Sequence, residues 1–179
     1  MLRMLYPFEY VESVFSIDYN FLYKKGYRGI IFDIDNTLVP HGKDATVEIE
    51  ELFKEIQMNG FKTILLSNNN EERVKRFLKN IDSLYICDAE KPKTDNYLKA
   101  VQMLKMEKSK VLYIGDQIFT DIYGANKSGI DNILVKYIGY YNNEKKGIKR
   151  NIEKIILKMY NSNKSYKNRI GNVQKEEAD

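Results

Sequence analysis

Short runs of apolar residues recur along the middle of the chain, and each run ends in small or polar residues. They lie at residues 29–33, 63–67, 84–87, 111–115 and 133–135. Their apolar character is continuous and does not alternate with polar residues, which is typical of strands buried on both faces of a parallel sheet. The pattern therefore predicts five buried parallel strands.

Between these runs, apolar residues recur at the three- and four-residue spacing of amphipathic helices. The three sets are Ile49, Leu52, Phe53 and Ile56, then Val74, Phe77 and Leu78, then Tyr97, Leu98, Val101 and Leu104. Strands that alternate with helices predict an α/β fold built on a doubly wound, Rossmann-like parallel sheet. We expect the strand order 3-2-1-4-5 or a variant of it, which makes the first and fourth predicted strands neighbours.

The two ends of the chain differ from this pattern. Residues 1–28 are rich in aromatic residues and predict a helical extension packed on the domain, although a membrane-facing aromatic surface is an alternative. Residues 148–160 have the spacing of a basic amphipathic helix, and we expect the polar chain after it to fray. The chain is thus interpreted as one domain over 1–143 followed by a basic segment over 144–179.

Composition limits the chemistry of any metal site. The 179 residues include a single cysteine, Cys87, and a single histidine, His41, so an internal disulfide and a zinc site of cysteine and histidine ligands are excluded. A bound metal must be held by oxygen atoms. The sequence lacks 18 consecutive apolar residues and a signal-peptide core, and we expect a reducing, cytoplasmic setting.

Positive charge is concentrated near the end of the chain. Residues 144–175 hold 10 Lys/Arg and 2 Asp/Glu, whereas residues 1–143 hold 19 Lys/Arg and 20 Asp/Glu. Such a segment indicates an anionic partner, either a lipid surface or nucleic acid, or simply a solubilising tail.

Pairs of carboxylates follow the first and fourth predicted strands. Asp33 and Asp35 leave the first strand, and Asp116 and Asp121 follow the fourth, after Gly115. The first pair points toward the crevice beyond the strand, and in the expected strand order Asp33 and Asp116 meet there. Clustered carboxylates repel one another unless a hard cation lies between them, so the pattern predicts Mg²⁺.

The second and third predicted strands end in groups that suit a phosphate. Ser67 and Asn68 offer a hydroxyl and a free backbone N–H, and Lys91 offers an ammonium group at the same edge. Asn69 and Asn70 are explained by helix capping alone. The sequence therefore predicts a phosphorylated ligand beside the metal.

These motifs resemble those of the haloacid dehalogenase superfamily. The motifs in question are Asp33-Ile34-Asp35-Asn36-Thr37-Leu38, Ser67-Asn68-Asn69, Lys91-Pro92, and Gly115-Asp116 with Asp121. Residues 1–140 are also similar to the bacterial subfamily IIIA phosphatases related to phosphatidylglycerophosphate phosphatases. The resemblance implies a phosphatase that forms an aspartyl-phosphate.

The resemblance also implies a role for each site residue. Asp33 is expected to be the nucleophile and Asp35 the general acid and base. Mg²⁺ is expected to be held by Asp33, by the backbone carbonyl of Asp35 and by Asp116, while Asp121 either binds the metal through water or orients Lys91. Ser67, the N–H of Asn68 and Lys91 are expected to neutralise the transferring oxygens.

The spacing of the motifs leaves no room for a folded cap domain, and open sites of this family favour large substrates. Phosphatidylglycerophosphate is the leading candidate, which would place the enzyme at the cytoplasmic face of a membrane. Nucleic-acid 3′-phosphate ends and phosphoproteins are alternatives, as is a receiver-like module that accepts phosphate without turnover. His41 lies in the loop after the first strand, where a lone histidine is expected to face solvent.

Overall fold

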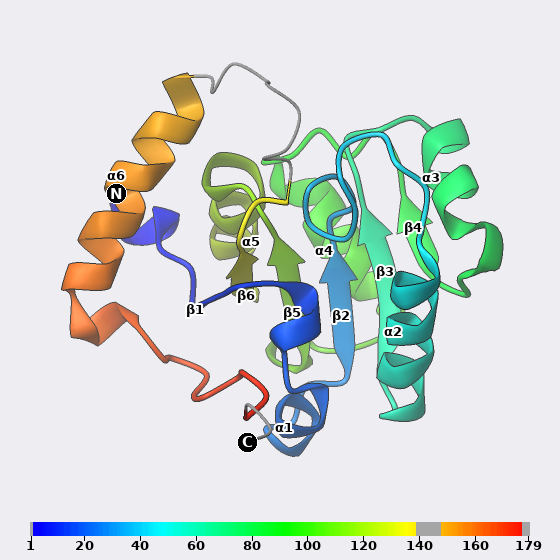
Figure 1. Ribbon diagram of the computed structural model, residues 1–179, viewed down its shortest axis with the longest axis horizontal. Coiled ribbons are helices and arrows are strands. Elements are labelled where there is room, and N and C mark those ends of the chain that lie inside the picture. Colours follow the sequence, from blue (N-terminus) through cyan, green and yellow to red (C-terminus); the bar gives the residue numbers. More distant parts are fainter. Residues whose placement is uncertain (1, 139–147, 177–179) are drawn as a thin grey trace.

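A parallel β-sheet covered by helices on both faces forms the centre of the protein (Figure 1). The computed structural model describes residues 2–138 and 148–176. Within them the sheet has six strands in the order β1-β6-β5-β2-β3-β4. The strands are β1 (Glu9–Val11), β2 (Gly29–Phe32), β3 (Lys62–Leu66), β4 (Leu84–Ile86), β5 (Val111–Gly115) and β6 (Asp131–Val135).

Helices connect the strands as crossovers. The α-helices are α1 (Tyr19–Lys24), α2 (Val47–Met58), α3 (Glu71–Phe77), α4 (Thr94–Leu104), α5 (Tyr123–Ser128) and α6 (Ile148–Ser162). A π-helical turn, Ile118–Ile122, precedes α5. Short 3₁₀ turns lie at Leu2–Leu5, Val14–Ser16, Leu78–Asn80, Lys108–Lys110 and Lys164–Tyr166.

The predicted doubly wound α/β fold is confirmed. The five predicted strands are β2 to β6, and their spatial order is the expected 3-2-1-4-5. Strands β2 and β5 are parallel neighbours, with Phe32 in register with Ile114. A loop and α2 separate β2 from β3, and among the described residues there is no separate cap domain.

The strands bury both faces because alternate residues enter two different cores. Ile30, Phe32 and Leu65 pack with α1, α2 and α3, whereas Ile31 and Ile64 pack with α4 and α5. This explains the continuous apolar runs in the sequence. Leu98 of α4, which the spacing assigned to the buried face, is instead exposed.

The N-terminal segment contributes a strand as well as helical turns. Residues 1–28 were expected to be helical, but Glu9–Val11 forms β1 and pairs with β6 at the edge of the sheet. Tyr6, Tyr19 and Tyr27 are buried, so much of the aromatic character of this segment is used in packing.

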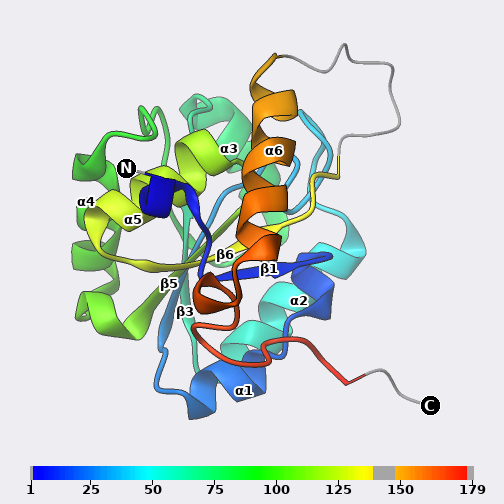
Figure 2. The ribbon, with the colours of Figure 1, turned by 90° about the vertical axis from the view of Figure 1, so that its left-hand side faces the viewer.

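The C-terminal segment packs along the same edge (Figure 2). Helix α6 begins at Ile148, the predicted residue. The chain after it was expected to fray, but part of it is packed against the domain. Ile170 and Val173 are buried, and Asp18 donates a backbone hydrogen bond to Val173. We call residues 163–176 the C-terminal arm. Residues 144–147 and 177–179 of the predicted basic segment lie outside the described residues.

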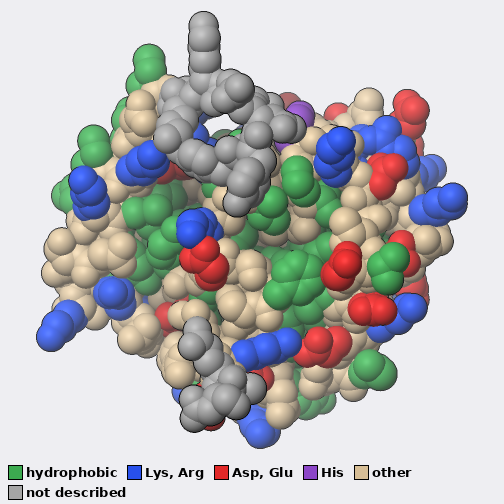
Figure 3. Space-filling view, viewed as in Figure 1, with side chains coloured by type: hydrophobic (Ala, Val, Ile, Leu, Met, Phe, Trp, Pro, Cys, Tyr) green, Lys and Arg blue, Asp and Glu red, His purple; other side chains and the backbone are tan. Residues whose placement is uncertain are grey.

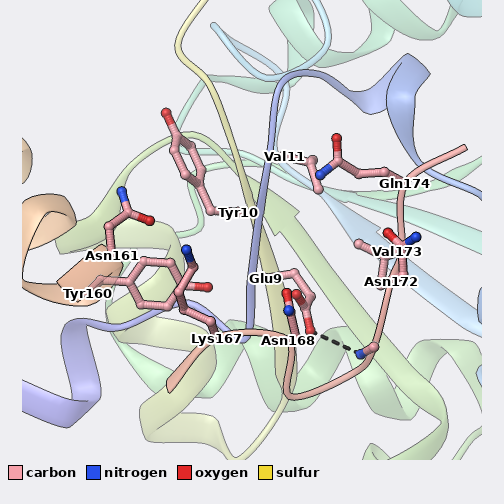
Figure 4. Close-up of a pocket in the computed structure, with 11 residues that line it drawn as sticks. Glu9, Tyr10, Val11, Tyr160, Asn161, Lys167, Asn168, Asn172, Val173 and Gln174 are labelled. Carbon is pink, nitrogen blue, oxygen red and sulfur yellow. Dashed lines mark hydrogen bonds between the residues drawn. The ribbon is translucent and has the colours of Figure 1, made fainter. Parts of the chain in front are cut away.

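A polar pocket separates the arm from β1 (Figure 4). The Glu9 carboxylate accepts hydrogen bonds from the backbone N–H groups of Ile170 and Gly171 at 2.6 and 3.2 Å. Burial raises the pKa of Glu9, although these two hydrogen bonds act in the opposite direction. None of the residues predicted for the functional site lines this pocket.

Helix α6 packs through a face that its hydrophobicity does not predict. Glu153, Ile156 and Tyr160 are buried against the domain. The more apolar face is exposed and carries Ile148, Ile152, Ile155 and Met159. Figure 3 shows hydrophobic and basic side chains together along the left-hand edge, where α6 lies. Among the described helices none has the length and apolar character needed to cross a bilayer.

Candidate active site

Three of the four predicted acids, all except Asp35, meet at the carboxyl ends of β2 and β5. Asp33 directly follows β2 and Asp116 directly follows β5, and these two strands are neighbours. Carboxylate oxygens of Asp33, Asp116 and Asp121 lie within 4.8 Å of one another, and all three residues are buried. The order of the strands thus concentrates negative charge at one point.

Lys91 lies inside this cluster. Its ammonium group donates to Asp33 Oδ1 at 2.5 Å and to Asp121 Oδ1 at 2.8 Å. The phenol oxygen of Tyr113 is a third partner at 3.1 Å. Burial alone would lower the pKa of Lys91, but the charges of Asp121 and Asp33 outweigh it and raise the pKa. Lys91 is therefore held as a cation between two carboxylates.

Thr37 links the two acids that follow neighbouring strands. Its hydroxyl lies 3.0 Å from Asp33 Oδ2 and 3.3 Å from Asp116 Oδ1. Burial raises the pKa of Asp33 to about 6, although Lys91 acts to lower it. Burial, together with the charges of Asp121 and Asp33, raises the pKa of Asp116 well above its ordinary value.

Asp121 is fixed by neutral donors as well as by Lys91. Tyr113 donates to its Oδ1 at 2.8 Å and the backbone N–H of Gln117 to its Oδ2 at 3.0 Å. Gly115 makes this position possible, because a Cβ added there would lie 2.6 Å from the Asp121 carboxyl carbon. The glycine before Asp116 thus allows the Asp121 side chain to approach the end of β5 closely.

Asp35 faces the loop over residues 39–46, which we call the flap, and not the other three acids. Its Oδ1 accepts from Arg73 at 2.9 Å and from the backbone N–H of Gly42 at 3.1 Å. Its Oδ2 accepts from Asn69 at 2.8 Å, and His41 Nδ1 lies 3.2 Å away. His41 is exposed as expected, yet it contacts a predicted catalytic residue.

These contacts keep Asp35 ionised. Burial acts to raise its pKa, but the hydrogen bonds from Asn69 and Gly42 and the charge of Arg73 together lower it. Arg73 also donates to the Lys43 carbonyl at 2.6 Å, so it joins α3 to the flap. In the described part of the chain its Nε and Nη1 atoms are buried without hydrogen-bond partners.

Ser67 and Asn68 lie at the end of β3, as predicted, but their contacts are local. The Ser67 hydroxyl accepts from the backbone and side chain of Asn69 at 3.1 and 2.9 Å. The Asn68 side-chain oxygen accepts from the backbone N–H of Lys91 at 2.8 Å. Asn68 therefore positions the chain that carries the site lysine.

Several residues of the site were not predicted from the sequence, and one of them was assigned a different role. Asn70 caps α3 as expected, but Asn69 contacts Asp35 and is more than a cap. Thr37 lies in the motif over residues 33–38 and Tyr113 in the predicted strand over residues 111–115. The sequence pattern did not indicate that either side chain contacts the acids. Arg73 belongs to α3, and the apolar spacing of this helix did not predict the contact between Arg73 and Asp35.

Arg150 reaches the acids from α6. Its Nη2 lies 2.5 Å from Asp116 Oδ2, and its Nη1 donates to the Asp116 backbone carbonyl at 3.1 Å. Glu153, one turn later, accepts from Arg150 at 2.9 Å and from the Ile118 N–H at 2.8 Å. The predicted basic helix therefore contacts the predicted metal site.

The donor set at the cluster fits a hard divalent cation. Three buried carboxylates face two cations, Lys91 and Arg150, among the described residues, so the cluster carries an excess of negative charge whenever all three acids are ionised. The donors are oxygen atoms, which Mg²⁺ prefers over nitrogen or sulfur. Asp33 and Asp116 are the acids with the fewest competing bonds and are best placed to hold it.

Comparison with known proteins identifies the family of the chain. The family profile of the haloacid dehalogenase-like hydrolases matches residues 42–129. A protein of Bacillus subtilis (strain 168) named Probable phosphatase YqeG is 35% identical over 176 residues, which cover 98% of this chain and 98% of that protein. The chain belongs to the haloacid dehalogenase-like hydrolases.

Solved structures share the fold at low identity. An uncharacterised protein from Listeria monocytogenes serotype 4b has a TM-score of 0.53 at 18% identity, covering 75% of this chain and 99% of that one. The cobalt-bound deoxy-D-mannose-octulosonate 8-phosphate phosphatase of Haemophilus influenzae has a TM-score of 0.50 at 16% identity, covering 79% and 92%. The predictions of this hydrolase family and of a phosphatase-type enzyme are confirmed.

Proposed function

We propose that this hydrolase is a Mg²⁺-dependent phosphomonoesterase that works through an aspartyl-phosphate on Asp33. The observation that carries the proposal is the position of Asp33, which is buried beside Lys91 and Asp116 at the carboxyl end of the sheet. A carboxylate held there can approach phosphorus, while cations around it offset the charge of the phosphoryl group.

The proposed reaction has two displacement steps. Asp33 forms a bond to phosphorus as the bond to the leaving oxygen breaks, and Asp35 supplies a proton to that oxygen. Because Asp35 is ionised in the free protein, it must first take up this proton from solvent as the anionic phosphate binds beside it. Water then attacks the aspartyl-phosphate, and Asp35 takes a proton from it. Ser67, the N–H of Asn68 and Lys91 would hold the phosphoryl oxygens, since all three follow strand ends at the same edge of the sheet.

Asp33, Asp116 and the backbone carbonyl of Asp35 would hold Mg²⁺, which when bound neutralises charge on the phosphoryl group. Two alternative roles were expected for Asp121, a metal contact through water or the orientation of Lys91. Its 2.8 Å contact with Lys91 and its bonds from Tyr113 and Gln117 favour the second role.

Three substitutions test the chemistry. Asp33→Asn should abolish phosphatase activity, and Asp35→Asn should lower turnover by roughly 10²- to 10⁴-fold, the usual contribution of general acid–base catalysis. Asp116→Ala should raise the Mg²⁺ requirement or remove activity. Activity within tenfold of wild type in Asp33→Asn, or activity that survives exhaustive chelation, would contradict the proposal.

We further propose a phosphomonoester on a lipid headgroup as the substrate, with phosphatidylglycerophosphate as the leading candidate. The absence of a cap domain among the described residues supports a substrate that covers the site itself. The exposed face of α6 supports an anionic bilayer as the surface that presents it. That face carries isoleucines next to Lys154 and Lys158, and each basic residue near such a surface contributes up to about 1 kcal/mol.

A vesicle assay tests the substrate and its location. The variant replaces the exposed lysines of α6 by glutamine, at Lys149, Lys154 and Lys158, and its control replaces exposed lysines elsewhere, at Lys54, Lys99 and Lys105. Both lose the same charge, so only the first should weaken binding to anionic vesicles at low salt. Point changes are preferable to truncation because the C-terminal arm is packed into the domain.

The lipid assignment also requires a preference in turnover. Phosphatidylglycerophosphate in anionic vesicles should be hydrolysed faster than a small soluble phosphate ester. If it is not, the lipid assignment fails, and 3′-phosphate ends of nucleic acid or phosphoproteins become the leading substrates. Equal vesicle binding by the two lysine variants would contradict a role for α6.

A further inference from the structure

Asp116 is held from outside the family's motifs by a residue of the C-terminal helix. Arg150 of α6 contacts both the Oδ2 atom and the backbone carbonyl of Asp116, at 2.5 and 3.1 Å. Two contacts to one residue fix its orientation as well as its charge, because the planar guanidinium presents its donors at fixed angles.

The two carboxylate oxygens of Asp116 face different partners. Oδ2 faces Arg150, whereas Oδ1 faces Thr37 at 3.3 Å, and Thr37 in turn contacts Asp33. Arg150 thus occupies the outer oxygen and leaves the inner one directed at the other acids. The Asp116 side chain is fully buried, so loss of Arg150 would leave the outer oxygen without a partner among the described residues.

Arg150 is itself held in place. Glu153 accepts from its Nη1 at 2.9 Å, and its guanidinium lies 4.1 Å from the centre of the Tyr137 ring. Glu153 also accepts from the Ile118 N–H, which anchors α6 to the turn that follows Asp116. These contacts restrict the guanidinium before any ligand binds.

We propose that Arg150 is a positioning residue that orients Asp116 for the divalent cation. The inference rests on the proposed function of Asp33 and Asp116 as metal ligands. It adds that α6, which lies outside residues 42–129, completes the metal site. Partners that orient metal ligands typically contribute about 10- to 100-fold to metal affinity.

Arg150 could also weaken metal binding, and this alternative predicts the opposite result in a binding experiment. A guanidinium close to the site repels a divalent cation, so removal of its charge alone would tighten metal binding. Orientation and repulsion therefore predict opposite signs. We expect orientation to dominate because Asp116 is buried and Arg150 holds it at two points.

Direct Mn²⁺ binding to the full chain, measured by the electron paramagnetic resonance signal of the free ion, separates the two effects without substrate. Arg150→Met should weaken Mn²⁺ binding by about tenfold or more. Arg150→Lys keeps the charge but lacks the planar pair of donors, so its affinity for Mn²⁺ should lie between that of wild type and that of Arg150→Met. Lys164→Met, which removes one exposed charge just beyond the same helix, is the control and should bind Mn²⁺ like wild type.

Each outcome decides the proposal. Binding by Arg150→Met that equals or exceeds that of wild type would overturn it, and so would an Arg150→Lys variant no tighter than Arg150→Met. Circular dichroism establishes that the variants are folded, and the lysine variant provides a test if the methionine variant unfolds. If wild type binds no Mn²⁺, the proposed metal-dependent function fails together with this inference, whereas normal binding by all variants overturns only the inference.

Discussion

Replacement of Lys91 should destabilise the protein in a manner that depends on pH. The Lys91 ammonium contacts Asp33 and Asp121 in a buried cluster of three acids. Lys91→Met keeps most of the side-chain volume but removes the charge. Loss of one member of a buried ion pair typically costs about 3–5 kcal/mol of unfolding free energy, because the partner is left buried without its counter-ion and must either stay charged there or take up a proton.

The pH dependence follows from Asp33. The pKa of Asp33 in the folded protein is about 6, above the ordinary value of 3.8, so the folded state holds this proton more tightly than the unfolded state. The stability that protonated Asp33 contributes is therefore complete below about pH 3.8 and is lost as the pH rises through 6. Lys91 acts to lower this pKa, so its removal extends the loss to higher pH. For one carboxyl that stays protonated up to pH 7.5, the additional loss between pH 6 and 7.5 is about 2 kcal/mol.

Urea unfolding with a chelator present measures this difference. We expect Lys91→Met to lose about 2 kcal/mol more relative to wild type at pH 7.5 than at pH 6. Lys93→Met is the matched control, since Lys93 is exposed and pairs only with exposed Glu90 in the described contacts. A loss that is equal at both pH values, or larger at pH 6, would refute the reasoning about the buried cluster.

Three further substitutions test the packing described above. Gly115→Ala should displace Asp121 and lower both activity and stability, the latter by about 1–3 kcal/mol as for an overpacked core; activity and urea unfolding equal to wild type would contradict the close approach. Ile170→Ala should cost about 2–5 kcal/mol in urea unfolding if the C-terminal arm is packed, whereas exposed Ile155→Ala should cost less than about 0.5 kcal/mol. Asn70→Ala should cost about 1 kcal/mol by removing the cap of α3, and an unchanged midpoint would mean that the cap is replaced by water.

The central fold was accessible from the sequence because its signals are local. A strand buried on both faces requires a continuous apolar run, as in Ile30 to Phe32, and the parallel order places the following polar residues at one edge. The proximity of Asp33 and Asp116 could be predicted for that reason. The short strand β1 was not accessible, since Glu9–Val11 contains a buried glutamate and three residues carry little periodicity.

The contacts that complete the site were not accessible from the sequence because they depend on tertiary packing. The apolar spacing of α6 indicates a face with Ile152 and Ile155, yet the structure buries the face with Glu153. The buried face brings Arg150 and Glu153 to their partners at the end of β5 and on the turn that follows it, and it also buries Ile156 and Tyr160. Arg73 is a similar case, because its contact with Asp35 joins two different crossovers.

The edge strand β1 also has a consequence for how the chain reaches its native state. Glu9 pairs in register with Ile133, and its carboxylate accepts from Ile170 and Gly171, so the first strand in the sequence depends on some of the most distant partners. Contacts between residues so far apart form slowly, since a long loop must close before they stabilise the chain. During vectorial synthesis β2 to β4 can pair and pack with α1, while residues 2–11 wait for β6 and α6 with their aromatic side chains exposed. Nascent chains shorter than about 135 residues should therefore be the species that need protection from aggregation.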